Sequence, residues 1–364
     1  MQVTREQVLA YRMQAQGLHR DSTDLAVLDI GVQDGPLDQA RLSFDARLPS
    51  TPPADRVGPG RRLALVWSLR GAPHVHRRAD LDAVAGALYP LSEADACGRL
   101  NETGPSVARA GIPALQQFEL ALAAMRKVIT EPMAKGAASA GVTKALPDVM
   151  GRDCRPCKAR HVSDSAMRST ALAAGLELQP GTSPPVLQPR PKARLPHRLD
   201  PVALRSLITA YLRLLGPATD ADVAGYLGAR RADLDEAWPD DLVEVTVDGR
   251  SCWLPSGVSL DVAPREVVRL LGGFDPYLQA RDRDLIVPDK AVQKVLWPVL
   301  GRPGAVLVDG EVLGMWRPKA AGKKLALHVE AVAPLPSSTW ELIEAEALRV
   351  GAVRGIETVS VVRV

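Results

Sequence analysis

Three arginines lie in a segment whose pattern is typical of proteins that dock on DNA. Arg230 and Arg231 begin the stretch RRADLDEAW, and Arg250 follows a tight turn between two runs that alternate apolar and polar residues. A guanidinium group binds phosphate oxygens through its fork of N–H donors. In a winged helix the third helix enters the major groove and the wing contacts phosphate. We therefore predict that these three side chains bind DNA.

Three short helices and a hairpin are expected to position these arginines. LRSLITAYLRLLG has apolar residues at helical spacing, and Gly216 with Pro217 ends that helix. DADVAGYLG forms the second helix, and RRADLDEAW is predicted as the third. LVEVTVDGRSCWLP then alternates around Asp248-Gly249, a strong hairpin signal. The pattern predicts a winged helix over residues 196–262.

Two further segments combine cations with residues suited to a nucleic-acid surface. In MWRPKAAGKK, Trp316 precedes Arg317 and Lys319, and a tryptophan beside clustered cations suits a turn that contacts the DNA backbone. In ARDRD, Arg281 and Arg283 alternate with aspartates. Each segment has an alternative interpretation. Trp316 could instead pack under its strand, and the charges of ARDRD could instead pair with one another at the surface.

A partial metal-binding pattern occurs at Cys154, Cys157 and His161. The spacing suits three ligands of a zinc site, but a second Cys-x-x-Cys is absent. Neighbouring cations would lower the thiol pKa, which makes redox chemistry conceivable. We expect an ordinary thiol pair, with metal binding as the alternative, and no cofactor.

The bulk properties favour a globular chain of several units. The sequence has 364 residues, 46% of them hydrophobic and 4% aromatic, with a net charge of +3. This mild basic excess permits nucleic-acid binding without requiring it. There is no apolar run of about eighteen residues and no signal-peptide pattern, so we expect a cytoplasmic protein that does not contact membranes. Four cysteines do not indicate a disulfide scaffold.

The order of patterns predicts an α+β chain of four segments: 1–118, 119–195, 196–262 and 263–364. Thr4 is expected to cap the first helix, and Ser139 to cap a helix inside a second helix-turn-helix. PGTSPPVLQPRPKARLP is predicted to be a linker because it is rich in proline. The last segment is expected to contain a hairpin at Asp309-Gly310, a well-capped helix over STWELIEAEALRVGAVRG and a terminal strand.

Six stretches in this order resemble the winged-helix DNA glycosylases of the AlkZ and YcaQ type. They are REQVLAYRMQAQGL, VWSLRGAPHVHRRADL, PMAKGAASAGVTKALP, GPATDADVAGYLG, LLGGFDPYLQARDR and VLVDGEVLGMWRP. The resemblance implies three tandem winged helices in a C-shaped array, with a small β-rich domain completing a DNA channel. Arg70 and His74 would line that channel. With His76, Arg77 and Arg78 they form a basic cluster suited to phosphates, although a solvated charged loop is the alternative.

The catalytic motif of that family is Gln-x-Gln or Gln-x-Asp, and it falls here on IGVQDGP. Two registers are possible. If Gln33 is the second motif glutamine, the first position is Gly31. If Gln33 is the first, the third position is Gly35, and Asp34 stands one residue early. In either register the resemblance assigns catalysis to Gln33 and Asp34, and the alternative is that both merely begin a turn.

An amide and a carboxylate together suit hydrolysis of an alkylated purine nucleotide. Alkylation at N7 makes the base a good leaving group, so the protein must only hold a water near C1′ and stabilise the oxocarbenium-like transition state. Gln33 would position the water, and Asp34 would accept its proton.

Two functional hypotheses from different classes follow. The first is a monofunctional, monomeric DNA glycosylase that acts on double-stranded DNA carrying alkylated or crosslinked bases. The second is a non-catalytic winged-helix protein that binds damaged DNA or regulates transcription. A repeat-like interaction protein unrelated to DNA is a third alternative.

Overall fold

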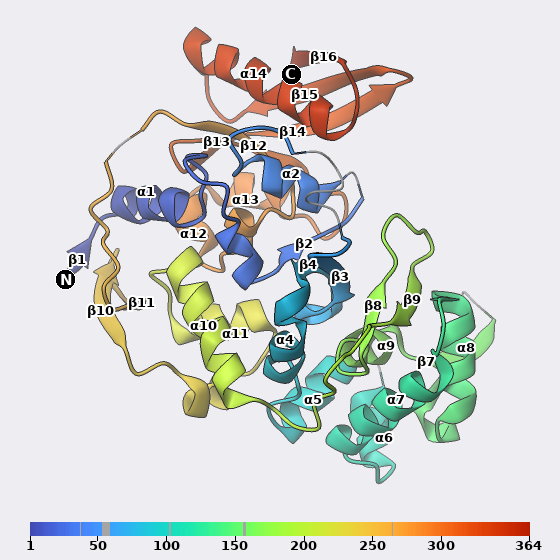
Figure 1. The fold of residues 1–364 in the computed structure, drawn as a ribbon. Helices are drawn as coiled ribbons and strands as arrows, with labels where there is room; N and C mark the ends of the chain where they lie inside the picture. Colours follow the sequence, from blue (N-terminus) through green and yellow to red (C-terminus); the bar gives the residue numbers. More distant parts are fainter. Residues whose placement is uncertain (37, 53–58, 102, 156–157, 264) are drawn as a thin grey trace. The chain divides into compact units, whose positions relative to one another are not determined.

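The computed structural model describes residues 1–36, 38–52, 59–101, 103–155, 158–263 and 265–364 (Figure 1). Helices and several β-sheets alternate along the chain, so the predicted α+β class is confirmed. The chain divides into two compact units. Unit 1 comprises residues 1–58, 209–223 and 240–364, and unit 2 comprises residues 59–208 and 224–239. Neither unit coincides with a single predicted segment, and the four-segment division stays a prediction.

Unit 1 begins with a short strand and a well-capped helix. The elements of its first part are β1 Gln2–Val3, α1 Arg5–Ala15, η1 Ala26–Asp29, β2 Val32–Gln33 and α2 Gln39–Asp45. The Thr4 hydroxyl accepts the Gln7 backbone N–H while the Gln7 side chain accepts that of Thr4, a complete capping box. The prediction that Thr4 caps the first helix is therefore confirmed.

The predicted Asp-Gly turn forms the hairpin of β10 Leu242–Val247 and β11 Arg250–Pro255. Asp248 and Gly249 have φ values of 48° and 77°, as two-residue turns of this class require. Strand β1 adds to the hairpin in parallel, pairing with β10. The predicted hairpin is thus confirmed, as part of a three-stranded sheet.

The third helix predicted for that winged helix does not form. Between α11 Asp220–Leu227 and the hairpin, RRADLDEAW makes two 3-10 turns, η5 Arg231–Asp233 and η6 Asp235–Ala237. Pro239 follows Trp238 directly and disfavours helical geometry there. The Ser92 hydroxyl also donates to the Asp233 carboxylate at 3.0 Å, which fixes the turns in place.

A five-stranded sheet with one helix forms the C-terminal part of unit 1. Its strands are β12 Val268–Leu271, β13 Gly304–Val308, β14 Glu311–Ala321, β15 Lys324–Ala331 and β16 Thr358–Arg363, neighbours in that order. The pairings are antiparallel except β15 with β16. Figure 1 shows α14 Ser337–Val353 alongside this sheet, and Trp316, Trp340 and Ile343 belong to the core between them. The hairpin predicted at Asp309-Gly310 is confirmed.

Two details of this C-terminal part differ from prediction. MWRPKAAGKK is mostly strand: β14 continues to Ala321, and the turn occupies only Gly322 and Lys323. Arg317 and Lys319 therefore lie on one face of the strand. Helix α14 is not well capped, because Pro336 occupies the N-cap and offers no side-chain acceptor.

Unit 2 is mainly helical and carries a mixed set of strands. Its strands are β3 Leu63–Trp67, β4 Pro73–Arg77, β5 Met133–Ala134, β6 Gly151–Cys154, β7 Ala159–Val162, β8 Leu176–Leu178 and β9 Val186–Pro189. Its helices before residue 200 are α4 Leu81–Ala87, α5 Glu93–Leu100, α6 Gly104–Arg109, α7 Ala114–Val128, α8 Lys135–Ala145 and α9 Asp164–Thr170. Phe118, Met125 and Leu187 are fully buried members of its core.

Two predictions for unit 2 are wrong. Ser139 does not cap a helix, because it lies inside the single helix α8 and its carbonyl accepts the Thr143 hydroxyl. The proline-rich stretch is not only a linker: β9 pairs with both β8 and β5. The helix α10 Pro201–Leu215 agrees with its predicted position. No helix in the described residues is both long and apolar enough to cross a membrane.

Candidate functional site

The Gln33-Asp34 pair stands where strand β2 ends and the chain approaches helix α2. Gln33 and Asp34 are both half-buried. The Asp34 Oδ1 accepts the backbone N–H of Ala40 at 3.2 Å, in the first turn of α2. Asp38, the N-cap of that helix, has a φ of 57° and makes no side-chain cap. Asp34 therefore supplies the helix N-terminus with the acceptor that Asp38 does not provide.

Burial changes the acid–base character of Asp34. Loss of solvent raises the pKa of its carboxyl above the usual value, and backbone hydrogen bonds from Ala40 and Gly35 oppose that rise. A carboxylate with a raised pKa binds a proton more readily than an exposed one. Asp34 thus has the chemistry of a proton acceptor, in addition to its contact with α2.

The two glycines next to this pair have different backbone requirements. Gly31 has a φ of 74°, a left-handed conformation that side chains rarely adopt. Gly35 is not among the positive-φ residues, and a side chain there would first meet Gln39 at 3.6 Å and the Phe274 ring at 3.7 Å. Both distances are ordinary van der Waals contacts. The backbone therefore favours glycine at position 31 and leaves room for a side chain at position 35.

Phe274 and Arg302 form the next layer around Gly35. The Arg302 guanidinium lies 5.1 Å from the centre of the Phe274 ring, a cation–π arrangement. The Gln39 Oε1 accepts the Phe274 backbone N–H at 3.4 Å, which links the β12 end to helix α2. Phe274 is half-buried, not a full core residue, and its ring lies between the Arg302 guanidinium and the open side of Gly35.

Two buried ion pairs hold the surrounding framework of unit 1. Arg47 donates to both oxygens of Asp275 at 2.8 Å, and these side chains are 1% and 0% exposed. Arg12 donates to both oxygens of Asp282 at 3.1 and 2.6 Å. Gln16 accepts from Arg47 at 2.8 Å and donates to the Leu214 carbonyl. The predicted ARDRD surface network is thus partly interior, because Asp282 is committed to Arg12.

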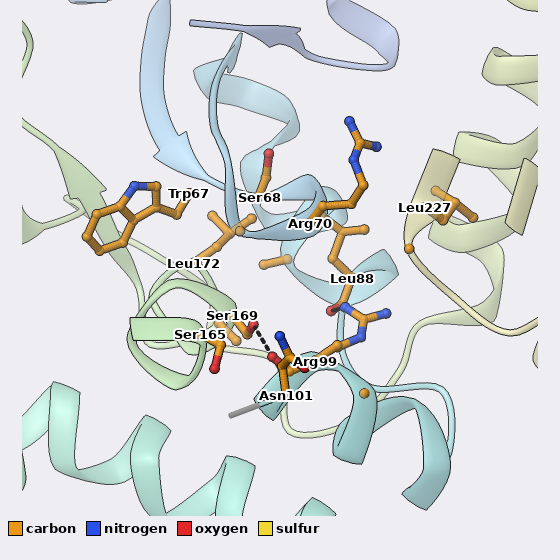
Figure 2. Close-up of a pocket in the computed structure, with 15 residues that line it drawn as sticks. Trp67, Ser68, Arg70, Leu88, Arg99, Asn101, Ser165, Ser169, Leu172 and Leu227 are labelled. Carbon is orange, nitrogen blue, oxygen red and sulfur yellow. Dashed lines mark hydrogen bonds between the residues drawn. The ribbon is translucent and has the colours of Figure 1, made fainter. Parts of the chain in front are cut away.

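Unit 2 contains a separate pocket of about 260 Å³. Figure 2 shows Trp67, Ser68 and Arg70 on one side of it and Ser165 and Ser169 on another. Ser165 donates to the Leu100 carbonyl at 2.7 Å and Ser169 to the Arg99 carbonyl at 3.2 Å. These hydroxyls satisfy the C-terminal end of α5, so their role in this pocket is structural.

The predicted basic cluster of unit 2 is mixed: its two histidines are buried, Arg77 and Arg78 are half-buried, and Arg70 is exposed. The Arg70 guanidinium lies 5.1 Å from the Tyr226 ring centre and donates to the Tyr226 carbonyl. His74 is 1% exposed, and its Nδ1–H is positioned to donate to the Ala72 carbonyl at 2.9 Å. The prediction that His74 contacts DNA is therefore corrected: strand β4 turns its ring into the interior. Arg77 lies 3.6 Å from Asp80 and is half-exposed.

Comparison with known proteins decides the family. The family model described as "DNA glycosylase AlkZ-like" matches residues 27–353. The chain belongs to the AlkZ-like DNA glycosylase family. The solved structure of Streptomyces sahachiroi DNA glycosylase AlkZ is similar with a TM-score of 0.77, at 22% identity and over 100% of both chains. At that identity the similarity supports the fold. None of the curated proteins matches the chain.

The AlkZ-like match includes all the predicted site residues, and the structure separates them by exposure. Besides Arg70, six of the predicted cations are exposed: Arg230, Arg231, Arg250, Arg281, Arg317 and Lys319. Two of them have acidic neighbours, since Arg250 lies 3.4 Å from Asp222 and Arg230 lies 3.8 Å from Asp233. Arg283 is half-buried against Trp297. Trp316 is 2% exposed and its Nε1 donates to the Leu271 carbonyl at 2.9 Å. The prediction that Trp316 contacts DNA is corrected, because the indole packs under its strand.

The possible metal site at Cys154, Cys157 and His161 is only partly described by the structure. Cys157 lies outside the described residues, and within the described part no three potential ligands gather at one point. A hydrogen bond to the Val162 carbonyl, with help from Cys154, raises the pKa of His161. Sequence reasoning missed Arg302, Arg47 and Asp275. Nothing in the sequence distinguishes Arg302 from other loop arginines, whereas Asp275 lies in the family stretch LLGGFDPYLQARDR.

Lowering the pH from 6.5 towards 4 is expected to destabilise unit 2. Burial lowers the pKa of His76 from 6.5 to about 4 and lowers that of His74 well below its usual value. Between these pH values the unfolded chain binds protons that the folded unit excludes. Stability is therefore complete above pH 6.5 and falls by about 1.4 kcal/mol per pH unit for each such histidine.

Urea unfolding midpoints between pH 7.5 and 5 measure this effect. His76→Gln is expected to flatten the dependence, whereas the exposed His197→Gln serves as the matched control and should leave it unchanged. Identical slopes for wild type and His76→Gln would contradict the assignment.

Proposed function

We propose that the chain is a monofunctional DNA glycosylase that hydrolyses the N-glycosidic bond of N7-alkylated purines, including crosslinked nucleotides. The observation that carries the proposal is an amide beside a half-buried carboxylate at the end of β2, inside the residues matched to the AlkZ-like family. The substrate would be double-stranded DNA, bound by a monomer. The tandem winged-helix array and its DNA channel belong to this proposal, supported by the similarity to AlkZ.

The proposed reaction is a displacement at C1′ of the damaged nucleotide. The Gln33 amide holds a water against C1′, the bond from C1′ to the base nitrogen breaks, and the alkylated base leaves neutral. The water oxygen bonds to C1′ while its proton passes to the Asp34 carboxylate. The negative charge of Asp34 also stabilises the oxocarbenium-like transition state. The raised pKa of Asp34 supports this role.

We infer that Gln33 occupies the first motif position and Gly35 the third. The left-handed backbone at Gly31 supports this register, since a glutamine there would be strained. The space beside Gly35 supports it as well. The catalytic carboxylate is then supplied by Asp34, one residue before the usual place.

DNA binding is proposed for the exposed cations of the predicted set. These are Arg230, Arg231, Arg250, Arg281, Arg317 and Lys319, and Arg70 is exposed as well. Their side chains are suited to phosphate oxygens, which position a duplex without reading its sequence. Arg70, Arg77 and Arg283 support them less directly, because aromatic or acidic neighbours hold their guanidinium groups.

A non-catalytic damage-binding protein is the second candidate. Two observations favour it: Gly35 has no side chain at the third motif position, and the Asp34 Oδ1 is committed to the N-terminus of α2. Such a protein would bind alkylated DNA and release no base. The two candidates therefore differ in one measurable product.

The purified protein is expected to release N7-methylguanine from methylated duplex DNA slowly but above the rate of spontaneous depurination. Released base is measured by liquid chromatography, and the abasic sites by alkaline cleavage on a gel. DNA incubated without protein is the control for spontaneous loss. Tight binding of methylated DNA at the spontaneous release rate would favour the damage-binding candidate.

A further inference from the structure

The loop of residues 298–302 in unit 1 presents two adjacent aliphatic side chains to solvent. It connects α13 Lys290–Leu296 to β13, and Val299 and Leu300 are 95% and 85% exposed. These are the two most exposed large hydrophobic side chains among the described residues. Single exposed aliphatic residues are ordinary on protein surfaces, but an adjacent pair on a loop tip indicates a contact surface.

Hydrogen bonds from two arginines fix the base of this loop. Arg302 Nε donates to the Pro298 carbonyl at 3.4 Å, and Arg317 Nη1 donates to the Gly301 carbonyl at 2.8 Å. Gly301 has a φ of 67°, so the turn requires glycine there. The preceding Trp297 is buried, and its Nε1 donates to the Leu278 carbonyl at 3.2 Å. These hydrogen bonds fix the conformation of the loop, so inserting its tip into a partner costs less conformational entropy.

The surroundings of the tip are cationic. Arg302 and Arg317 frame the loop, and Arg317, Lys319 and His328 line an adjoining hollow of about 410 Å³. Glu330 is the acidic residue on that lining. An apolar tip between guanidinium groups matches the alternation of stacked bases and phosphates along a nucleic acid.

The loop also connects to the candidate catalytic pair within the same unit. Arg302 lies over the Phe274 ring, and that ring lies 3.7 Å from the position of a side chain at Gly35. Gly35 follows Asp34 directly. Arg302, Phe274 and Gly35 thus link the base of the 298–302 loop to the residue that follows Asp34, all within unit 1.

We propose that Val299 and Leu300 form a wedge that enters the base stack of duplex DNA beside the damaged nucleotide. The inference rests on the proposed function for its partner, double-stranded DNA, but not on base release. Aliphatic side chains inserted at a base step unstack it and kink the duplex, while nearby arginines neutralise the phosphates. Unstacking would expose the glycosidic bond of the damaged nucleotide to Asp34.

A duplex with 2-aminopurine next to N7-methylguanine tests the wedge directly. Binding of wild-type protein is expected to raise 2-aminopurine fluorescence severalfold because the base loses its stacking partners. The Val299→Ser, Leu300→Ser double variant should lose that rise and bind roughly tenfold or more weakly, since two aliphatic side chains lose their burial. The matched control is Leu348→Ser, a 59% exposed position on α14, which should behave as wild type.

Several results would overturn the wedge. One is an undiminished fluorescence rise in the double variant. A second is unchanged DNA binding accompanied by loss of a dimer in sedimentation, which would assign the tip to a second copy of the chain. A third is a double variant that loses binding to anionic vesicles but keeps its binding to DNA. Leu300→Met keeps an aliphatic tip and is expected to retain the rise.

The same experiment separates the wedge from the proposed glycosylase activity. A wild-type protein that unstacks 2-aminopurine without releasing base contradicts the glycosylase and leaves the wedge intact. A double variant that still releases base with full unstacking contradicts the wedge alone. Absence of DNA binding in the wild type contradicts both.

Discussion

Replacing Gln33 and Asp34 together by alanine is expected to lower the release of N7-methylguanine about 100-fold or more. The substitution removes both the water-positioning amide and the proton acceptor, and positioned general bases typically contribute 10²- to 10⁴-fold. DNA affinity should stay within about twofold, because neither side chain is one of the proposed phosphate contacts. Single-turnover release assays and a binding titration measure the two quantities separately.

The structural role of Asp34 requires its own control. Asp34→Asn keeps an Oδ1 that can accept the Ala40 N–H but cannot accept a proton from water. It should therefore preserve the unfolding midpoint and still lose release. Release at the wild-type rate in Asp34→Asn would show that Asp34 only caps α2.

Gly35→Gln distinguishes the motif registers, because it restores a Gln-x-Gln sequence where space allows a side chain. An increased release rate is the expected result. A well-folded Gly35→Gln protein with no increase would contradict the register that places Gln33 first.

Replacing Asp275 by alanine is expected to destabilise the protein by about 3–5 kcal/mol, which is a large fraction of the stability of a typical domain. The reason is that Arg47, 1% exposed, would keep its charge in the interior without a partner. Denaturant unfolding followed by far-UV circular dichroism gives the free energy. The largest effect is expected on unit 1, to which both residues belong.

Two comparison variants separate burial from simple loss of charge. Asp284→Ala removes the partner of Lys290, a pair whose side chains are 68% and 69% exposed, and should cost less than about 1 kcal/mol. Arg47→Met combined with Asp275→Leu removes both buried charges and should be less destabilising than Asp275→Ala alone. Equal losses in Asp275→Ala and Asp284→Ala would contradict the importance of burial.

Features encoded by a few adjacent residues could be predicted from the sequence. The capping box at Thr4 needs only Gln7, and the hairpins at Asp248-Gly249 and Asp309-Gly310 need only residues that accept positive φ. Each of these local choices is determined by backbone geometry and short-range hydrogen bonds. The capping box and the hairpin at Asp309-Gly310 also lie at or next to stretches on which the family resemblance depends.

Features that depend on distant partners could not be predicted. The arginines around His74 suggest a phosphate ligand, yet three consecutive residues of β4 are buried, so both faces of the strand are covered. The proline-rich stretch gave no strand signal, but β8 and β5 provide β9 with hydrogen-bonding neighbours. The roles of Arg47 and Asp275 emerge only when residues 228 positions apart meet.

The family motif predicts the position of Gln33 and Asp34 in the sequence, but it does not predict which residues surround them. The sequence predicts a turn after Gln33 and Asp34, and this turn is compatible with both a catalytic and a purely structural role of the pair. The contact with Ala40, the Phe274 ring beside Gly35 and the Arg302 cation come from segments that fold against each other.

The two interior arginines have a consequence for any attempt to divide this protein. Arg12 and Arg47 stand in the first 58 residues, and the carboxylates that neutralise them lie beyond residue 270. A fragment holding Gln33 and Asp34 without that later stretch would retain two guanidinium groups with no counter-charge. We expect such a fragment to aggregate when expressed alone, and to regain solubility when the complementary piece is supplied in the same cell.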